Sequence, residues 1–340
     1  MNILFDLNHP VDVNFFKQVI FLLKSQEHNV IITYRPRGKL QKIIDYELSD
    51  FNCTPIGGHY KVFVFKVLGQ LYRDVIMCKF QRKNKIDLSV CFGSTNAISS
   101  WLNNIPYLAF DDDIEYKIPF YHANIFSTRH IMPDRITFTN SKTHKYKGFK
   151  ELAYLHPNYF TPKETELAKY GIKENYYVFI REIANVSLNY KKENKCIRDI
   201  IKALKLKGYQ IVISLEDENL EKSLKDDCII LEEPVTDIYS IIKFSKFVIS
   251  SGDTMAREAC LLGTPCIYTG GREMVMNSEL IEMGAMFKAD DLKNVIEQID
   301  VLSISKTRSD IERQINHMIR TTWEDTTSVI LKHIRSCSEL

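Results

Sequence analysis

Short apolar runs alternate with longer segments of helical periodicity along most of the chain. In the first half, this pattern predicts strands at residues 2–7, 30–33, around 53, 88–92 and 107–110. Helices are predicted between them, at residues 14–25, 40–48, 60–83 and 96–102. Strands that alternate with helices in this way form a parallel sheet whose two faces are both covered by helices. We therefore expect the first half to fold as a doubly wound α/β domain.

The second half of the chain repeats the alternation. Strands are predicted at residues 176–180, 210–214, 228–231, 247–249 and 266–268. Helices are predicted at residues 193–207, 236–243, 254–262, 277–283 and 291–300. A final amphipathic helical pattern covers about 307–337 and includes Trp323. Because 340 residues exceed the usual size of one domain, we expect two such domains.

A stretch without clear periodicity separates the two halves and contains Pro157 and Pro162. Proline interrupts regular elements, so residues 155–162 are interpreted as the linker. The predicted organisation is an N-terminal Rossmann-like acceptor domain over 1–158, a C-terminal Rossmann-like donor domain over 159–310, and C-terminal helices over 311–340 that could cross back to the first domain. The carboxyl ends of the two sheets would then face one cleft, which is where such folds bind ligands.

Charge and cysteine content make several classes of function unexpected. The 45 Lys and Arg residues nearly balance the 43 Asp and Glu residues, and no long block of one sign occurs, so nucleic acid is not an expected partner. The eight cysteines are scattered without a CxxC pair, which is typical of reduced thiols in a cytosolic protein. The N-terminal segment turns polar too early for a signal peptide, and no apolar run is long enough to span a membrane. A cytoplasmic protein is therefore expected.

One segment suggests contact with a membrane surface. Residues 60–68 combine aromatic and aliphatic side chains with lysines. The cations that follow are Arg73, Lys79, Arg82, Lys83 and Lys85. Such a patch could hold the protein at the inner face of the membrane, where it would meet a lipid-linked acceptor. An amphipathic helix packed on the sheet with its lysines outward explains the same pattern, and we favour that interpretation.

Residues 247–265, FVISSGDTMAREACLLGTP, are the most informative about function. An apolar strand ends in small residues and runs directly into a helix that begins near Asp253. Backbone N–H groups at a helix start, together with the positive end of the helix dipole, favour a phosphate. Glu258 lies one turn after Thr254 on the same helix face, so its carboxylate could accept both hydroxyls of a ribose. The pattern suggests a nucleotide-sugar pocket, and an ordinary capped turn is the alternative.

Four segments carry a resemblance to known proteins. They are FDLNHPVDVNFFK (5–17), YLAFDDDIEYKIPF (107–120), YKGFKELAYLHPNYFTP (146–162) and ISSGDTMAREACLLGTP (249–265). With these segments the chain resembles GT-B-fold proteins, and more narrowly an uncharacterised family, a domain of unknown function, of bacterial and archaeal proteins. That family is related to the lipid-linked glycosyltransferases of cell-wall synthesis and to the non-hydrolysing UDP-N-acetylglucosamine 2-epimerases.

The resemblance implies two Rossmann-like domains facing across a cleft, with a nucleotide-sugar donor held mainly by the C-terminal domain. It makes Gly252, Thr254 and Glu258 candidates for donor contact, with Glu258 on the ribose. The nucleotide sugar, expected to be UDP-linked, is then a substrate rather than a cofactor. No metal ion is expected, because GT-B enzymes that resemble this chain generally do not need one.

Two departures weaken the epimerase interpretation. The turn at 91–96 resembles one that contributes to the site of the 2-epimerases, but their Gly-Asp-Thr order is Gly93-Ser94-Thr95 here. The His-Val-Glu-Ala-Gly run expected after the next strand is replaced by residues 109–113, AFDDD. Asp112 or Glu115 could substitute for the missing carboxylate, so an epimerase stays open.

The turn after the first strand is expected to open into the cleft, because it follows the strand directly and precedes a helix. His9 could act there as a general base on an acceptor hydroxyl, since imidazole titrates near working pH. Asp6 or Asp12 could orient it. The alternative is that His9 caps the helix, with Pro10 at a helix entry where its missing N–H costs little.

The run Asp111-Asp112-Asp113-Ile114-Glu115 lies at another strand end. Its carboxylates repel one another, so one of them could have a raised pKa and serve as an acid or base, and Asp112 and Glu115 are favoured for this role. A divalent metal site and a solvated loop with an N-cap Asp are the alternatives.

Further residues of the second domain are expected to contact the donor. Arg181 ends the first strand of that domain, where a forked, permanently charged side chain would meet the diphosphate, although a surface ion pair is equally open. Two glycines after a later strand could let the backbone approach the sugar or phosphates, unless they form a plain loop. The predicted donor-binding residues are Arg181, Ser251, Gly252, Asp253, Thr254, Glu258, Gly270 and Gly271. Residues interpreted as cleft or hinge residues without an assigned catalytic role are Lys147, Lys150, Glu151 and His156.

The predicted function is transfer of a sugar from a nucleotide donor to an acceptor hydroxyl in surface polysaccharide or glycolipid assembly. The acceptor would be a saccharide or a lipid-linked molecule, and His9 or a carboxylate of 111–115 would deprotonate it. One alternative is a non-hydrolysing 2-epimerase, which needs a base at the sugar C2 and no acceptor. Another is an inactive nucleotide-sugar-binding subunit of a biosynthetic complex.

Overall fold

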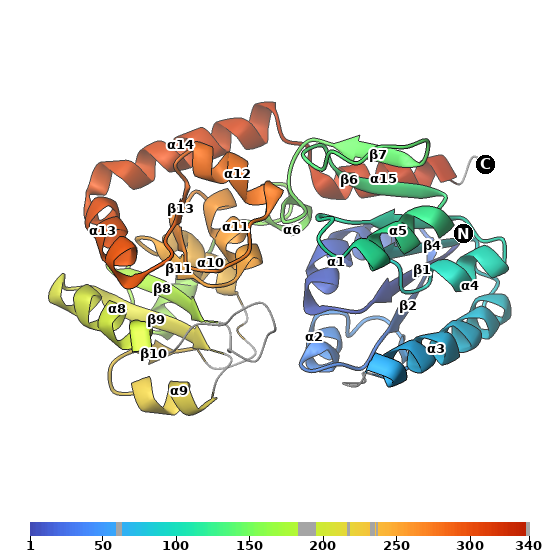
Figure 1. Cartoon of the computed structure of the whole chain (residues 1–340), viewed down its shortest axis with the longest axis horizontal. Helices are drawn as coiled ribbons and strands as arrows, with labels where there is room; N and C mark the ends of the chain where they lie inside the picture. The colour runs from blue at the N-terminus through green and yellow to red at the C-terminus, as the bar shows by residue number, and fades with distance from the viewer. Residues whose placement is uncertain (59–62, 183–194, 216–217, 232–234, 236, 338–340) are drawn as a thin grey trace. The chain divides into compact units, whose positions relative to one another are not determined.

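The computed structural model of the protein describes residues 1–58, 63–182, 195–215, 218–231, 235 and 237–337. The chain divides into two compact units (Figure 1). The first unit consists of Met1–Tyr159 together with Trp323–Leu340, and the second of Phe160–Thr322. The chain therefore passes between the units twice, once inside the linker predicted at 155–162 and once just before Trp323.

The first unit is built on a seven-stranded sheet in the order β3-β2-β1-β4-β5-β6-β7, with every pair of neighbours parallel. Its strands are β1 (Asn2–Leu7), β2 (Asn29–Tyr34), β3 (Cys53–Pro55), β4 (Leu88–Phe92), β5 (Tyr107–Phe110), β6 (Arg129–Pro133) and β7 (Thr143–Tyr146). Its helices are α1 (Pro10–Ser25), α2 (Leu40–Glu47), α3 (Phe63–Lys83), α4 (Ala97–Leu102), α5 (Lys117–Phe126), α6 (Leu152–Leu155) and α15 (Thr326–Cys337).

The direction of the crossovers decides which face of this sheet each helix covers. Parallel strands are joined by right-handed crossovers, so α1 and α2, which move the chain from β1 toward β3, lie on one face. The connections from β3 through β6 run the other way, which places α3, α4 and α5 on the opposite face. On the first face, α1 is also packed against α6 and α15.

The second unit has a six-stranded parallel sheet in the order β10-β9-β8-β11-β12-β13. Its strands are β8 (Tyr177–Glu182), β9 (Gln210–Leu215), β10 (Ile229–Ile230), β11 (Val248–Ser250), β12 (Cys266–Tyr268) and β13 (Met286–Lys288). Its helices are α7 (Thr165–Lys169), α8 (Lys195–Leu206), α9 (Glu218–Leu224), α10 (Ile238–Phe244), α11 (Asp253–Leu261), α12 (Val275–Glu282), α13 (Leu292–Ser303) and α14 (Ser305–Thr321).

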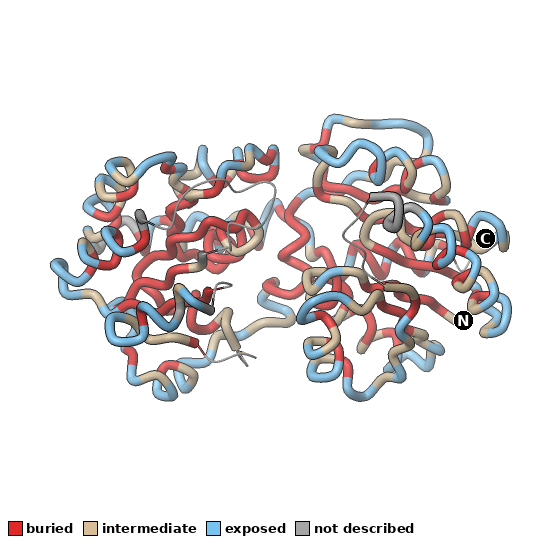
Figure 2. The backbone as a smooth tube through the Cα atoms, turned by 60° about the horizontal axis from the view of Figure 1, so that its bottom comes forward, coloured by how far each residue is buried: buried red, intermediate tan, exposed pale blue. Residues whose placement is uncertain are grey.

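Each unit has its own apolar interior, and the buried backbone follows the strands of both sheets (Figure 2). In the first unit, Phe15 and Phe16 of α1 pack edge-to-face against Phe5, Phe92 and Phe110 of the sheet. In the second unit, apolar residues of α8 and α13 pack against β8 and β9. The two Rossmann-like, doubly wound parallel sheets that the sequence predicts are confirmed.

The predicted elements agree with the structure at most positions, and the differences are local. The sequence pattern missed α5, α6, α7, α9, β6, β7 and β13, all of which are short. The helical pattern predicted over about 307–337 corresponds to two helices, α14 and α15, and Trp323 lies in the break between them. Helix α14 belongs to the second unit, which extends to Thr322 rather than ending at 310.

The predicted surface patch at 60–68 falls partly outside the described residues. One cation assigned to its surroundings is not at the surface, because Arg73 is fully buried and forms an ion pair with Asp6. Across the part of the chain that the structure describes, we find no helix that combines the length and apolarity needed to cross a membrane.

Candidate functional site

Asp6, at the end of β1, anchors the carboxyl edge of the first sheet. Its carboxylate accepts hydrogen bonds from Arg73 at 2.6 Å, from the Thr33 hydroxyl at 2.8 Å, from the Thr95 hydroxyl at 2.7 Å and from the Asn8 amide at 3.0 Å. Burial opposes ionisation of Asp6. The charge and hydrogen bond of Arg73, together with the hydrogen bonds from Asn8 and Thr95, outweigh that effect and lower the pKa of Asp6. An ionised carboxylate whose lone pairs are engaged in this way holds strands and helices together and is a poor proton acceptor.

His9 is the N-cap of α1. Its Nδ1 accepts a hydrogen bond from the Val11 N–H at 3.3 Å, while Asp12 accepts hydrogen bonds from the backbone N–H groups of Asn8 and His9. Asp12 therefore orients the turn rather than the imidazole ring. Partial desolvation and the charges of Arg37 and Lys150 lower the pKa of His9 to about 4, so the ring is neutral at physiological pH.

This capping contact constrains what His9 can do chemically. A ring nitrogen that accepts a hydrogen bond carries no proton, so the neutral tautomer has its proton on Nε2. Nε2 can then donate a hydrogen bond to a ligand, and only Nδ1 can accept a proton. Action of His9 as a general base, which stays a prediction, requires Nδ1 to leave the Val11 N–H or the tautomer to exchange.

A buried ion pair joins the β5 end to the segment before α6. The Lys150 ammonium lies 2.6 Å from Asp112 Oδ2 and 5.3 Å from the centre of the Phe92 ring, and both charged side chains are almost fully buried. The same ammonium lowers the pKa of His9 and opposes the rise in the pKa of Asp12. Burial nevertheless raises the pKa of Asp12 to about 7. His9, Asp12, Asp112 and Lys150 thus form one polar group at the carboxyl edge of the first sheet.

The carboxylates of the acidic run after β5 have different partners. Asp111 binds Nε2 of the fully buried His130 at 2.7 Å, and burial raises the pKa of Asp111 to about 6. Asp113 accepts a hydrogen bond from the Glu115 N–H at 3.1 Å, which makes a local turn, and the Glu115 side chain is exposed just before α5. Of the two carboxylates favoured from the sequence, only Asp112 joins the polar group with His9.

In the second unit, β11 leads into α11 through a tightly bonded turn. Gly252 is the N-cap in an extended conformation, and the Ser250 hydroxyl bonds both its N–H, at 3.1 Å, and its carbonyl, at 2.9 Å. The Ser251 N–H donates to the carbonyl of Arg181 at 3.1 Å, which ties the turn to β8. The helix start predicted from the sequence is therefore present and rigidly held.

Charged side chains surround this helix start. The Asp253 carboxylate lies 3.3 Å from Arg272 and 3.5 Å from the buried Arg257, so its charge is balanced within the unit. A carboxylate in the first turn of a helix is favoured by the helix dipole, which also favours an anionic ligand there. Arg272, which sequence reasoning did not single out, could move from Asp253 to such a ligand.

Glu258 is 4% exposed and accepts a hydrogen bond from the Tyr239 hydroxyl, on α10, at 3.2 Å. Thr254, one turn earlier, is half-buried. A carboxylate held in place by a phenol can accept hydroxyl donors, which is the chemistry expected for binding a ribose. Tyr239 was not predicted, because nothing in its spacing from Glu258 marks it.

The remaining donor candidates lie at neighbouring strand ends. Arg181 Nη1 donates to the Ser214 hydroxyl at 2.9 Å, and its side chain is half-buried. A Cβ atom on Gly270 would lie 2.5 Å from both the Ser251 carbonyl oxygen and the Tyr268 hydroxyl, so the close approach that Gly270 permits is to the β11–α11 turn. Gly271 is exposed and has open space around it.

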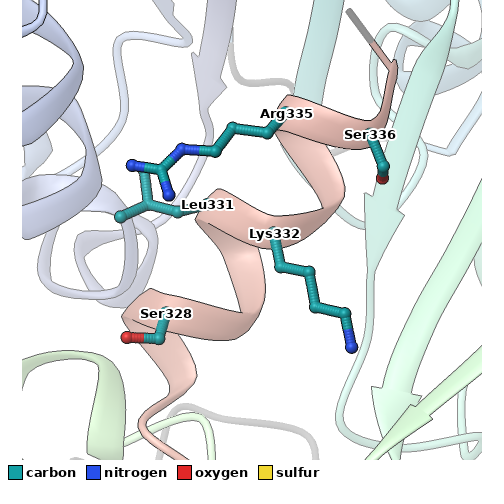
Figure 3. A pocket seen from close by; sticks show the side chains of 5 residues that line it. All are labelled: Ser328, Leu331, Lys332, Arg335 and Ser336. Atoms are coloured by element: carbon teal, nitrogen blue, oxygen red, sulfur yellow. The ribbon is translucent and has the colours of Figure 1, made fainter. Parts of the chain in front are cut away.

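One pocket lies apart from these residues. A pocket runs along α15 and is lined by Ser328, Leu331, Lys332, Arg335 and Ser336, with Arg335 and Lys332 extending in different directions (Figure 3). It contains none of the residues predicted from the sequence.

Among the described residues, no group of three or more His, Cys, Asp or Glu side chains is arranged to hold a metal ion.

The family profile described as Protein of unknown function (DUF354) matches residues 1–338. An uncharacterised protein of Methanocaldococcus jannaschii is 23% identical over 323 residues, which cover 88% of this chain and 91% of that protein.

Two solved structures show the similarity of the fold. The UDP-GlcNAc 2-epimerase of Neisseria meningitidis, bound to UDP-GlcNAc, has a TM-score of 0.70 at 13% identity, and the match covers 99% of this chain and 100% of that one. The spinosyn rhamnosyltransferase SpnG, complexed with spinosyn aglycone, has a TM-score of 0.70 at 14% identity. The match covers 98% of this chain and 100% of that one.

Proposed function

Because the chain belongs to the family described as Protein of unknown function (DUF354), and because its fold is shared by a UDP-GlcNAc 2-epimerase and a glycosyltransferase, we propose that it transfers a sugar from a nucleotide-sugar donor to an acceptor hydroxyl. The observation that carries the proposal is the helix start of α11, with the buried carboxylate of Glu258 one turn later. A nucleoside diphosphate presents anionic phosphates, which a helix N-terminus favours, and a ribose diol, from whose hydroxyls a carboxylate can accept hydrogen bonds.

In this proposal the second unit binds the donor. The diphosphate lies against the N-terminal end of α11 with Arg181 and Arg272 as cationic partners, and Glu258 accepts the ribose hydroxyls. The donor is UDP-linked, in line with the UDP-GlcNAc that the Neisseria epimerase binds, and it is consumed as a substrate rather than retained as a cofactor.

The first unit supplies the groups that act on the acceptor, which is a saccharide or a lipid-linked molecule. The acceptor oxygen forms a bond to the anomeric carbon, the bond from that carbon to the diphosphate oxygen breaks, and the hydroxyl proton passes to a base. His9 and Asp112 are the candidates for that base. Lys150 holds Asp112 in place.

Transfer is favoured over epimerisation by the residues after β4 and β5. The turn there reads Gly93-Ser94-Thr95, and the carboxylates after β5 are engaged, Asp111 with His130 and Asp112 with Lys150. A 2-epimerase must remove a proton from carbon at the sugar C2, and a carboxylate held by a buried ammonium is too weak a base for that step. The acceptor hydroxyl of a transferase is less demanding, because it loses its proton as its oxygen bonds to the anomeric carbon.

Incubation of the purified protein with a panel of nucleotide sugars, with and without acceptor extract, tests the proposal. We expect release of nucleoside diphosphate that depends on the acceptor, with UDP-sugars as the best donors. A new sugar isomer with the nucleotide retained, seen by proton NMR, would show an epimerase instead. Thermal stabilisation by a nucleotide without any turnover would point to an inactive binding subunit.

Glu258→Gln tests the donor site separately from catalysis. The loss of a charged acceptor for two hydroxyls should weaken UDP binding roughly tenfold to a hundredfold, because hydrogen bonds to charged groups contribute about 1.5–3 kcal/mol. Titration calorimetry with UDP measures the change, and Glu282→Gln, at an exposed position at the end of α12, is the matched control. Equal UDP affinity in both variants would remove Glu258 from the site.

A further inference from the structure

The helix layer α3–α5 of the first unit exposes an unusual amount of apolar side chain. These three helices cover one face of the sheet, where α4 packs against both of its neighbours (Figure 1). The Arg82 guanidinium bonds Asn103 at 2.7 Å between α3 and α4, and Trp101 meets Phe126 edge-to-face between α4 and α5. The exposed large apolar residues of this layer are Leu68, Leu71, Tyr72, Val75, Trp101, Leu102, Tyr116, Ile118, Tyr121 and Ile125, which we call the apolar face.

Helix α3 exposes a stripe of apolar side chains. The spacing of Leu68, Leu71, Tyr72 and Val75 places them in one stripe, and all are more than half exposed. The opposite side of the helix is buried. It holds Arg73, whose guanidinium pairs with Asp6, and also Met77, which belongs to an apolar core cluster. A surface helix ordinarily buries its apolar stripe, so the outward stripe of α3 requires a separate explanation.

Helix α5 continues the same surface. Ile118 is 86% exposed, and Tyr121 and Ile125 follow it at helical spacing on the outer side. On the other side of α5, Phe120 and Ala123 are buried against the sheet. The apolar face therefore extends across the layer instead of consisting of isolated side chains.

The charges beside the apolar face are predominantly positive. Between residues 68 and 126, the exposed cations are Lys79, Arg82, Lys83, Lys85 and Lys117, whereas the exposed carboxylates are Glu115 and Asp87. Asp87 is already engaged by the backbone N–H of Asn2 at 2.7 Å. The whole chain carries a net charge of only +2, so this excess is local to the layer.

We propose that the apolar face docks the protein onto the surface of an anionic lipid membrane. Leucine, isoleucine, tyrosine and tryptophan side chains insert at the boundary between head groups and acyl chains, and lysine and arginine beside them are attracted by anionic head groups. A second copy of the chain fits less well, because a two-fold contact would bring the same cations on both copies together. The proposal does not depend on sugar transfer, since binding is measured without turnover.

Vesicle flotation with the full-length protein tests the proposal. Phosphatidylcholine vesicles are compared with vesicles of phosphatidylcholine and phosphatidylglycerol in equal amounts. We expect binding to the anionic vesicles that is at least tenfold stronger than to the neutral ones and that weakens as salt is raised. Equal binding to both kinds of vesicle, or binding to neither, would overturn the proposal.

A variant pair locates the contact. Leu71→Asp combined with Ile118→Asp should weaken binding to anionic vesicles at least tenfold, because charge is placed in the inserted surface. The matched control is Leu206→Asp on α8 of the second unit, where the side chain is 82% exposed, and it should leave binding unchanged. Thermal unfolding checks that both proteins fold, which is expected because all three positions are at the surface.

Two results would contradict the assignment of this face. One is equal weakening of vesicle binding by the control, which would place the contact elsewhere. The other is a dimer of the wild-type protein in size-exclusion chromatography with light scattering that the double variant converts to monomers. That outcome would identify a second copy as the occupant of the face.

Discussion

At the scale of single residues, identical side chains have different chemistry because their partners differ. Asp6 is ionised against a buried guanidinium, and the pKa of Asp12 is raised to about 7 by burial. Asp111 pairs with a buried histidine, whereas Asp112 pairs with a lysine. The sequence shows these four aspartates at or after the ends of two strands, and their partners lie up to 89 residues away in the chain.

The raised pKa of Asp12 predicts a pH-dependent effect of Asp12→Asn. Between about pH 4 and 7 the folded protein holds a proton on Asp12 that the unfolded chain has released, so this residue's contribution to stability falls as pH rises through 7. Asparagine cannot ionise and keeps an oxygen that can accept from the two backbone N–H groups. The variant should therefore gain stability relative to wild type as pH is raised.

Urea unfolding at pH 5 and pH 8 measures this difference, with each pKa unit equivalent to about 1.4 kcal/mol. Asp50→Asn, at an exposed position, serves as the control. His9 has the opposite sign: its pKa is lowered to about 4, so its contribution is present above about pH 6.5 and is lost as pH falls. Asp12→Asn leaves the His9 contribution in both proteins, so it cancels in the comparison. A difference that is the same at both pH values would show that Asp12 ionises normally.

At the scale of elements, the sequence pattern predicted where strands and helices lie more reliably than it predicted which of their side chains are exposed. The strands β1, β4, β5 and β12 have the predicted bounds. The exposed stripe of α3 could not be predicted, because apolar residues lie on both sides of the helix and periodicity does not show which side faces the sheet. The buried position of Arg73 on α3 became visible only with its ion pair to Asp6.

Gly270 provides a test of how the strand ends of the second unit are packed. Gly270→Ala should destabilise the protein by about 1–3 kcal/mol, because the new methyl group would lie 2.5 Å from the backbone oxygen of Ser251 and overpack the turn before α11. Gly271→Ala is the matched control, since the space around that residue is open. Denaturant unfolding of the two variants gives the comparison, and similar stabilities would mean that the turn yields without cost.

At the scale of the whole molecule, the chain returns from the second unit to complete the first. Helix α15 packs on α1 and α6, and the hydroxyls of Thr326 and Thr327 donate to the carbonyls of Phe149 and Ala153, each at 2.8 Å. Trp323, in the break before α15, meets Phe149 edge-to-face. The first unit therefore depends on a segment that is remote in sequence.

Removal of residues 323–340 should destabilise the first unit selectively. Hydrogen exchange followed by mass spectrometry should show faster exchange in α1 and α6, which lose a packing partner, and unchanged exchange in β8 and β9. An equal increase in both units would show that α15 supports the whole chain. The full-length protein measured under the same conditions is the reference.

The sequence by itself determined the two parallel-sheet domains, the strand-to-helix turns at their carboxyl ends and the family resemblance, because these depend on local periodicity and short motifs. Only the tertiary structure decided which polar side chains meet: Asp6 with Arg73, Asp112 with Lys150, and Glu258 with Tyr239. Crossover connections bring these partners together from separate segments, and spacing along the chain carries no trace of that. Burial then sets their pKa values and limits which of them can exchange a proton.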